Sequence, residues 1–112
     1  MAKPRSRNYS PVAREAAALI GAMIRTARLN RKMTLAELAE RTGVARGLVA
    51  RVENGDMGSA IGAVFEMAAV LGVPLFEAEP TRLTERLDQA KSVNALMPKR
   101  AFQSAVKVDD DF

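Results

Sequence analysis

Two arginines five residues apart, Arg46 and Arg51, are the side chains of this sequence best suited to a specific chemical task. A guanidinium group is planar and carries five N–H donors, so it can bind the two acceptors of a guanine edge, or a phosphate, in bidentate fashion. Arg46 is therefore the candidate for reading a base. Arg51 is a candidate for a base or phosphate contact, with an ordinary solvated arginine as the alternative. Gly47 between them offers no side chain and permits close backbone approach or recognition of shape alone.

Phosphate contacts are expected beside this pair. Thr34 is predicted to begin a helix, and the free N–H groups and dipole at a helix N-terminus attract an anion. Asn54 is a second candidate, and Arg31 and Lys32 add positive charge nearby. The complete set of predicted DNA-binding residues is Lys32, Thr34, Ala45, Arg46, Gly47, Arg51 and Asn54.

Two short helices must position these side chains. Thr34 and Glu37 have the spacing of a capping box, which predicts a helix from Leu35 to about Arg41, and Gly43 ends it because glycine adopts positive φ without steric cost. A second helix is predicted over about 46–53. The two are expected to pack through Leu38, Ala39, Val44, Val49 and Val52. Two helices joined by a short turn containing glycine form a helix-turn-helix, whose second helix enters the major groove.

Helices are also predicted on both sides of this motif. Ser10 and Pro11 have the residue types of a helix start, and a buried stripe at spacings of three and four predicts a helix over 11–30. The stripe consists of Ala13, Ala16, Ile20, Met23, Ile24 and Ala27. A further helix, closed by Gly72, is marked by Ile61, Val64, Phe65, Ala68 and Leu71, and residues 73–76 follow as a turn or short helix. An amphipathic helix is predicted over 81–96, with Leu83, Leu87 and Ala90 on one face. No segment alternates with period two, so the predicted fold class is all-α.

The net charge differs in sign between the two halves of the chain. The net charge is +4, with +7 in residues 1–55 and −3 in residues 56–112. This asymmetry favours a face that meets a polyanion, although a merely solvated surface explains it equally well. The sequence has no Cys and no His, which removes thiolate ligands and the commonest metal ligand and general base. No catalytic constellation stands out, so neither enzymatic activity nor a cofactor or metal is expected.

The segment from Thr34 to Gly55, TLAELAERTGVARGLVARVENG, resembles the lambda-repressor/Cro (XRE) family. The shared features are the Thr N-cap, Leu38-Ala39, Gly43-Val44 and Glu53-Asn54-Gly55. The resemblance implies a lambda-repressor-like five-helix DNA-binding domain over residues 11–80, here with an N-terminally extended first helix and an extra C-terminal helix. It also implies an ion pair between Arg28 and Glu53, and a dimeric repressor that binds a palindromic operator. Departures from the family pattern are Leu35, Ala45 and Asp56.

The two ends of the chain complete the predicted organisation. Residues 1–10 are expected to form a flexible basic arm, residues 81–97 the C-terminal helix and residues 98–112 a flexible acidic tail. The strings GSAIGAVFEMAAVLGVPLF, MPKRAF and VDDDF resemble HipB-type antitoxins, which implies a HipA-like kinase toxin as partner. A protein-binding adaptor that uses the same helical fold without specific DNA binding is the alternative. The longest apolar run, Ala16 to Ile20, is too short to span a membrane, so a cytoplasmic protein is expected.

Overall fold

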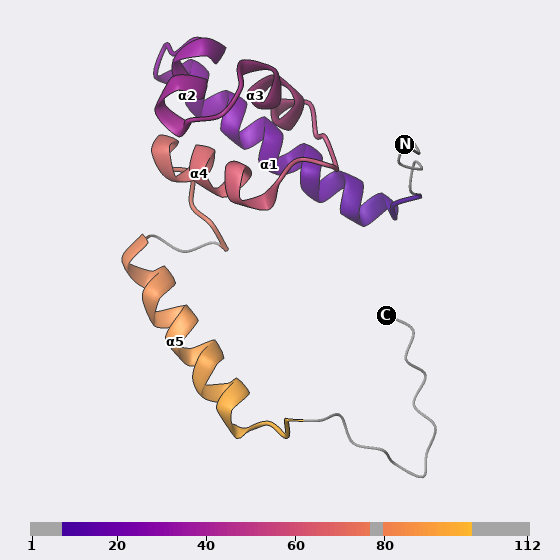
Figure 1. The fold of residues 1–112 in the computed structure, drawn as a ribbon, viewed down its shortest axis with the longest axis vertical. Helices are drawn as coiled ribbons and strands as arrows, with labels where there is room; N and C mark the ends of the chain where they lie inside the picture. Colours follow the sequence, from indigo (N-terminus) through magenta and orange to yellow (C-terminus); the bar gives the residue numbers. More distant parts are fainter. Residues whose placement is uncertain (1–7, 77–79, 100–112) are drawn as a thin grey trace. The chain divides into compact units, whose positions relative to one another are not determined.

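The computed structural model describes residues 8–76 and 80–99, and the chain divides into two compact units, Met1–Glu77 and Ala78–Phe112 (Figure 1). The first unit contains helices α1 (Pro11–Asn30), α2 (Leu35–Thr42), α3 (Arg46–Glu53) and α4 (Ile61–Leu71). No strand occurs in the described residues, which confirms the all-α prediction. Residues 1–7 of the predicted arm and 100–112 of the predicted tail lie outside the description.

Local capping explains where these helices begin and end. Ser10 Oγ accepts a hydrogen bond from the Ala13 N–H at 3.2 Å, and Pro11 occupies the first helical position of α1. Gly43 and Gly72 follow α2 and α4 with φ of 75° and 74°, the left-handed conformation that favours glycine. The predicted bounds of α1 and α3 are confirmed, and α2 continues one residue beyond the predicted end, to Thr42.

The core of the first unit is built from aliphatic side chains of all four helices and the turns between them. Its buried members are Ile24, Met33, Leu38, Ala39, Val49, Val52, Met67, Ala68, Leu71 and Val73. The predicted packing residues of the helix-turn-helix lie in this cluster, with Val44 half-buried against it. Burial of these apolar side chains is the main force that holds α2 against α3.

Three of the apolar residues that mark the predicted helices α1 and α4 are exposed. Ile61 is 68% exposed, and Met67, which was not on the predicted stripe, is fully buried. The reason is that α4 carries a single charge, Glu66, and is otherwise apolar on all sides, so its sequence does not show which face packs. Ala16 and Met23 of α1 are also exposed. Residues 73–76, predicted as a turn or short helix, form no helix, and Phe76 lies in a turn.

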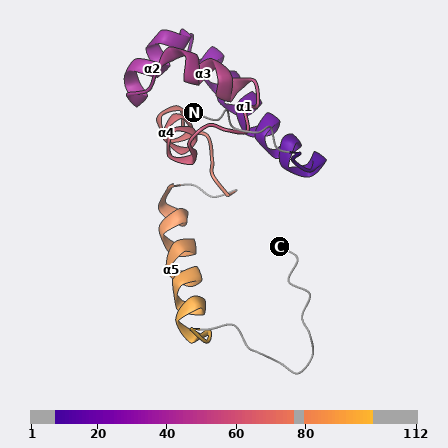
Figure 2. The same ribbon diagram turned by 45° about the vertical axis from the view of Figure 1, so that its right-hand side comes forward.

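Helix α1 is the longest helix of the first unit and packs against two of the others. It contacts α3 and α4, and α2 contacts the same two helices. In both views the N-terminal half of α1 extends past the other three helices (Figures 1 and 2), and no side chain from Pro11 to Ile20 is buried. This is the N-terminally extended first helix that the sequence predicts.

Gly21 marks the closest approach of α1 to α3. A Cβ atom built on Gly21 would lie 2.2 Å from the Val52 carbonyl oxygen and 3.0 Å from that of Glu53, both backbone atoms. Gly55, with φ of 80°, lies against Ala18 in the same way. The absence of a side chain at position 21 is therefore what allows α1 to cross the end of α3. Sequence reasoning did not single out Gly21, although a glycine in the middle of a helical pattern is a signal for such contacts.

The second unit contains α5 (Pro80–Leu96), which begins one residue before the predicted start. Leu83 is half-buried, whereas Leu87 and Ala90 of the predicted apolar face are exposed. In the described part of the chain, no helix combines the length and the apolar character needed to cross a membrane.

Candidate nucleic-acid interface

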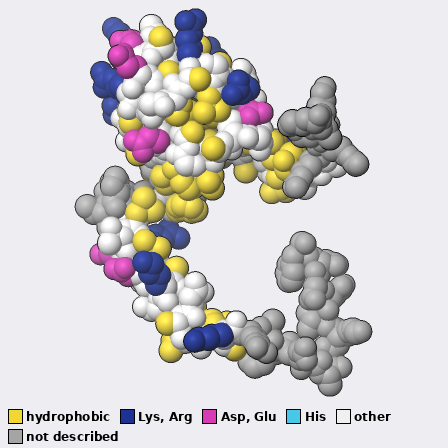
Figure 3. Space-filling view, viewed as in Figure 1, with side chains coloured by type: hydrophobic (Ala, Val, Ile, Leu, Met, Phe, Trp, Pro, Cys, Tyr) yellow, Lys and Arg dark blue, Asp and Glu magenta, His cyan; other side chains and the backbone are white. Residues whose placement is uncertain are grey.

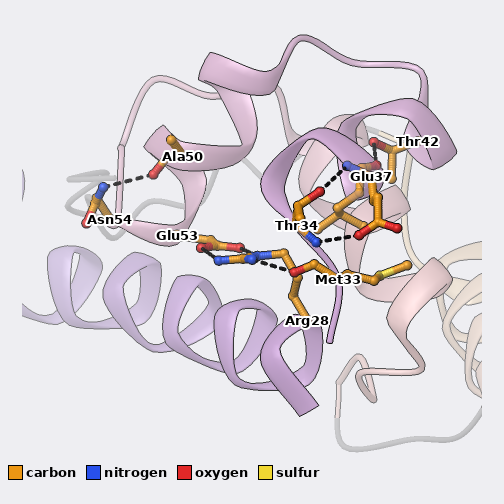
Figure 4. Close-up of polar contacts among 9 residues, drawn as sticks. Arg28, Met33, Thr34, Glu37, Thr42, Ala50, Glu53 and Asn54 are labelled. Carbon is orange, nitrogen blue, oxygen red and sulfur yellow. Dashed lines mark hydrogen bonds and ion pairs between the residues drawn. The ribbon is translucent and has the colours of Figure 1, made fainter. Parts of the chain in front are cut away.

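A buried ion pair fixes the end of α3 to α1. Arg28 Nε donates to Glu53 Oε2 at 2.6 Å and Arg28 Nη2 donates to Glu53 Oε1 at 2.9 Å, in the bidentate geometry that Arg and carboxylate favour (Figure 4). Arg28 Nη1 donates to the Met33 carbonyl at 2.8 Å. The two charged side chains are only 8% and 6% exposed. The hydrogen bond to Glu53 raises the pKa of Arg28, so the guanidinium stays charged. The pair implied by the family resemblance is thus present.

The exposed side of α3 carries the predicted recognition residues. Arg46, Gly47, Arg51 and Asn54 are all exposed, whereas Val49 and Val52 are buried. A Cβ atom at Gly47 would lie 3.5 Å from Arg51 Nη1, so the Arg51 guanidinium reaches back over the bare backbone at Gly47. Ala45 caps α3 without a side-chain hydrogen bond. The structure therefore groups four of the predicted residues on one exposed surface.

The capping box at the start of α2 limits what Thr34 can offer a phosphate. The Thr34 N–H donates to Glu37 Oε1 at 2.7 Å, and Thr34 Oγ1 accepts from the Glu37 N–H at 3.0 Å (Figure 4). The hydrogen bond from the Thr34 backbone lowers the pKa of Glu37, which keeps this carboxylate charged. The hydroxyl proton of Thr34 is the remaining side-chain donor. The sequence predicted this capping box, but its consequence, that the Thr34 N–H is not available to a phosphate, was not drawn.

Two basic residues of the turn after α1 have different surroundings. Lys32 is exposed and has a φ of 56°. Arg31 Nη1 donates to the Val70 carbonyl at 3.3 Å, near the C-terminal end of α4, where a positive charge is favoured by the helix dipole. The Arg31 guanidinium is therefore directed at the end of α4, whereas Lys32 extends from the turn as an exposed cation.

A shallow polar hollow lies where α1, α2 and α3 meet. It has a volume of about 260 Å³ and is lined by Arg25, Arg28, Leu35, Ala50, Glu53 and Asn54. Asn54 Nδ2 donates to the Ala50 carbonyl at 2.9 Å, which leaves its second N–H for another acceptor. Arg25 was not predicted as a site residue. Its position three residues before Arg28 on α1 is the only sequence signal that could have indicated it.

Comparison with known protein families agrees with this geometry. Residues 24–77 match the family model described as Helix-turn-helix, and the match covers α2, α3, α4 and the buried ion pair. The match supports a DNA-binding helix-turn-helix of the XRE type and, together with the arrangement of the helices, a lambda-repressor-like helical fold. A search of curated proteins found no match.

Proposed function

We propose, from the helix-turn-helix match over residues 24–77, that this protein is a cytoplasmic transcriptional repressor that binds a specific DNA sequence. One observation carries the proposal: α3 exposes Arg46, Gly47 and Arg51 while its other face is buried and its end is held by the Arg28–Glu53 pair. A helix held in this way can enter the major groove without losing its orientation. Because the backbone of α3 is already fixed, little backbone conformational entropy is lost when it binds.

In this proposal the contacts divide into two kinds. Arg46, in the first turn of α3, binds O6 and N7 of a guanine, and Arg51 binds an adjacent base or phosphate. The Thr34 hydroxyl, the second Asn54 N–H and Lys32 contact phosphates, which fix the register of the domain on the duplex. Ala45 and Gly47 lie at the same surface without polar side chains and allow the backbone to approach the DNA closely.

The first prediction concerns Arg46→Ala. We expect it to weaken binding to the specific duplex by about 1–3 kcal/mol and to relax preference at one base position. The duplex is obtained by binding-site selection from random DNA, and affinity is measured by fluorescence anisotropy. Arg82→Ala removes the same charge from an exposed position of α5 and serves as control. If Arg46→Ala retained wild-type affinity and preference while the wild type bound specifically, α3 would not read bases through Arg46.

We also propose a homodimer on a palindromic operator, because one domain reads a half-site and paired half-sites lie about 34 Å apart. Exposed apolar side chains support this. They include Val12, Leu19 and Met23 of α1, Ile61 of α4, and Leu87 and Val93 of α5. The candidate interface surfaces are Ala13, Ala16 and Ala17 of α1, and Leu83, Leu87 and Ala90 of α5. Figure 3 shows hydrophobic side chains gathered over α4 and the segment that follows it. Light scattering is expected to give the dimer mass; a monomer at concentrations well above the DNA dissociation constant would contradict the dimer.

The resemblance to HipB-type antitoxins supports a narrower proposal, a HipA-like kinase toxin as partner. The proposed contact is the acidic C-terminal tail, residues 107–112, which lies outside the described residues. Calorimetry with the full chain and with a chain lacking those six residues tests this: equal affinity for the kinase would remove the tail from the interface.

The adaptor alternative predicts instead that binding-site selection enriches no duplex.

A further inference from the structure

We propose that α1 pairs in antiparallel fashion with α1 of a second copy of this chain, through an apolar stripe on its exposed side. The stripe consists of Val12, Ala16, Leu19 and Met23, all of which are exposed. The inference rests on the proposed function, because it gives the homodimer an interface and an orientation. Of the other α1 residues considered for that interface, Ala13 and Ala17 are half-buried and lie outside the stripe.

The spacing of the stripe is that of helices that pair along their length. Its members are separated by four, three and four residues, which is how the apolar positions of a coiled coil alternate. At about 100° per residue, the stripe lies about 140° around α1 from its buried residues Gly21, Ile24 and Arg28. None of the charged residues of α1 belongs to the stripe. A second helix can therefore lie along it without contacting α3 and without placing a charge between the helices.

The stripe is complementary to itself. Its spacing reads the same in both directions, so a two-fold axis between residues 17 and 18 maps it onto the stripe of the second copy. This axis sets Ala16 opposite Leu19 of the second copy, and Val12 opposite Met23 of the second copy. Each pair joins a smaller side chain to a larger one, which lets facing layers interdigitate. A parallel pair would instead set two alanines against each other, and packed interiors leave few such gaps.

A groove at the C-terminal end of the stripe is placed to receive the start of the second helix. It has a volume of about 390 Å³ and lies between α1 and residues 72–74. None of its lining residues is charged, and the apolar ones are Ala22, Met23, Ala27, Val73 and Pro74. In the antiparallel pair, Val12 of the second copy faces Met23 at the near end of this groove. A side chain that is 75% exposed in the single chain is thereby surrounded by apolar groups.

The protruding half of α1 leaves room for the second copy. It extends past α2, α3 and α4 in both views, and no side chain over residues 11–20 is buried (Figures 1 and 2). The shared stretch, residues 12–23, is about 17 Å long. With the axis between residues 17 and 18, the halves of α1 that carry the other three helices lie at opposite ends of the pair. Helix α3 of each copy thus remains exposed.

Disulfide cross-linking tests the pairing and its direction, because the sequence contains no cysteine. Oxidation of an equimolar mixture of the full chains Ala16→Cys and Leu19→Cys is expected to give a covalent dimer. Helices packed about 8–10 Å apart bring facing Cα atoms within the ~4.4–6.8 Å that a disulfide spans. Either variant alone should give little covalent dimer, since its two cysteines are displaced by three residues, about 4.5 Å along the helices. Efficient cross-linking of Ala16→Cys alone would show a parallel pair and overturn the proposal.

A charge placed in the stripe provides a second measurement. Leu19→Asp should raise the dimer dissociation constant by about 100-fold, because the pair would bury an unpaired carboxylate. Light scattering over a concentration series measures this constant, and circular dichroism confirms that the variant is folded. Leu29→Asp is the matched control, since Leu29 is a 50% exposed leucine of the same helix that lies about 110° around it from the stripe. This variant should keep the wild-type constant.

The outcomes separate the interface from the proposed function. If Leu19→Asp dimerised as tightly as the wild type, the stripe would not be the interface, while the homodimer and base reading by Arg46 would stand. A covalent dimer from Leu87→Cys of α5, with none from the mixed α1 variants, would place the interface on α5 instead. If the wild-type chain were a monomer, the helix pair and the homodimer would both fall.

Discussion

Glu53→Ala is expected to lower the free energy of unfolding by about 3–5 kcal/mol, a large part of the ~5–15 kcal/mol by which a typical domain is stable. The substitution leaves the Arg28 guanidinium buried without the carboxylate that now accepts two of its hydrogen bonds. An exposed ion pair would contribute about 0–1 kcal/mol, so burial decides the magnitude. Urea denaturation monitored by circular dichroism measures the change.

Glu66→Ala is the matched control, because Glu66 is an exposed glutamate of α4 in the same unit. Its effect should remain within about 0.5 kcal/mol. The double variant Arg28→Met/Glu53→Leu removes both charges and should recover much of the loss, since replacing a buried pair by apolar side chains is often neutral or stabilising. The pair would have no structural role if Glu53→Ala cost no more than Glu66→Ala.

Gly21→Ala should destabilise the protein by about 1–3 kcal/mol, although alanine is the better helix former by about 1 kcal/mol. The added methyl group would meet the Val52 carbonyl oxygen at 2.2 Å, and a backbone atom cannot rotate away as a side chain does. Either α1 moves away from α3 or the end of α3 is distorted. Thermal denaturation should show a melting temperature lower by several degrees, since ~1 kcal/mol corresponds to ~4–8 °C in a domain of this size.

Gly62→Ala provides a control of opposite sign. Gly62 is exposed in α4, and a Cβ atom there meets nothing within 4 Å, so only the helix propensity changes. This variant should be stabilised by up to about 1 kcal/mol. Equal stabilisation by Gly21→Ala and Gly62→Ala would show that α1 does not need the close approach.

The parts of the fold that sequence predicted well are those set by neighbouring residues. Ser10 and Pro11 begin α1, the Thr34–Glu37 box begins α2, and Gly43 and Gly72 end their helices, and each of these depends on residues within one turn. Burial was predicted where charged residues mark the outer face, as in α2. The pattern of α4 did not show which side is buried, and Ile61 is exposed, because α4 has too few polar residues to distinguish its two sides.

The candidate site shows the same division. The exposed row on α3 follows from helical periodicity alone, and Arg46 and Arg51 remain predictions as DNA contacts. The hollow at Arg25, the Arg31 contact with Val70 and the crossing at Gly21 each join residues far apart in the chain. Such contacts depend on the angles and positions at which the helices cross, and the pattern of residues in a single sequence does not specify them.

Helix α1 is attached to α3 along only one half of its length. Gly21 lies near its midpoint, with about 15 Å of helix on each side at 1.5 Å per residue. The C-terminal half of α1 contacts the end of α3 at Gly21 and, two turns further on, through Arg28, whereas the N-terminal half protrudes. Because α1 and α3 are held together at two separate points, we expect a force that tilts the protruding half of α1 to tilt α3 with it.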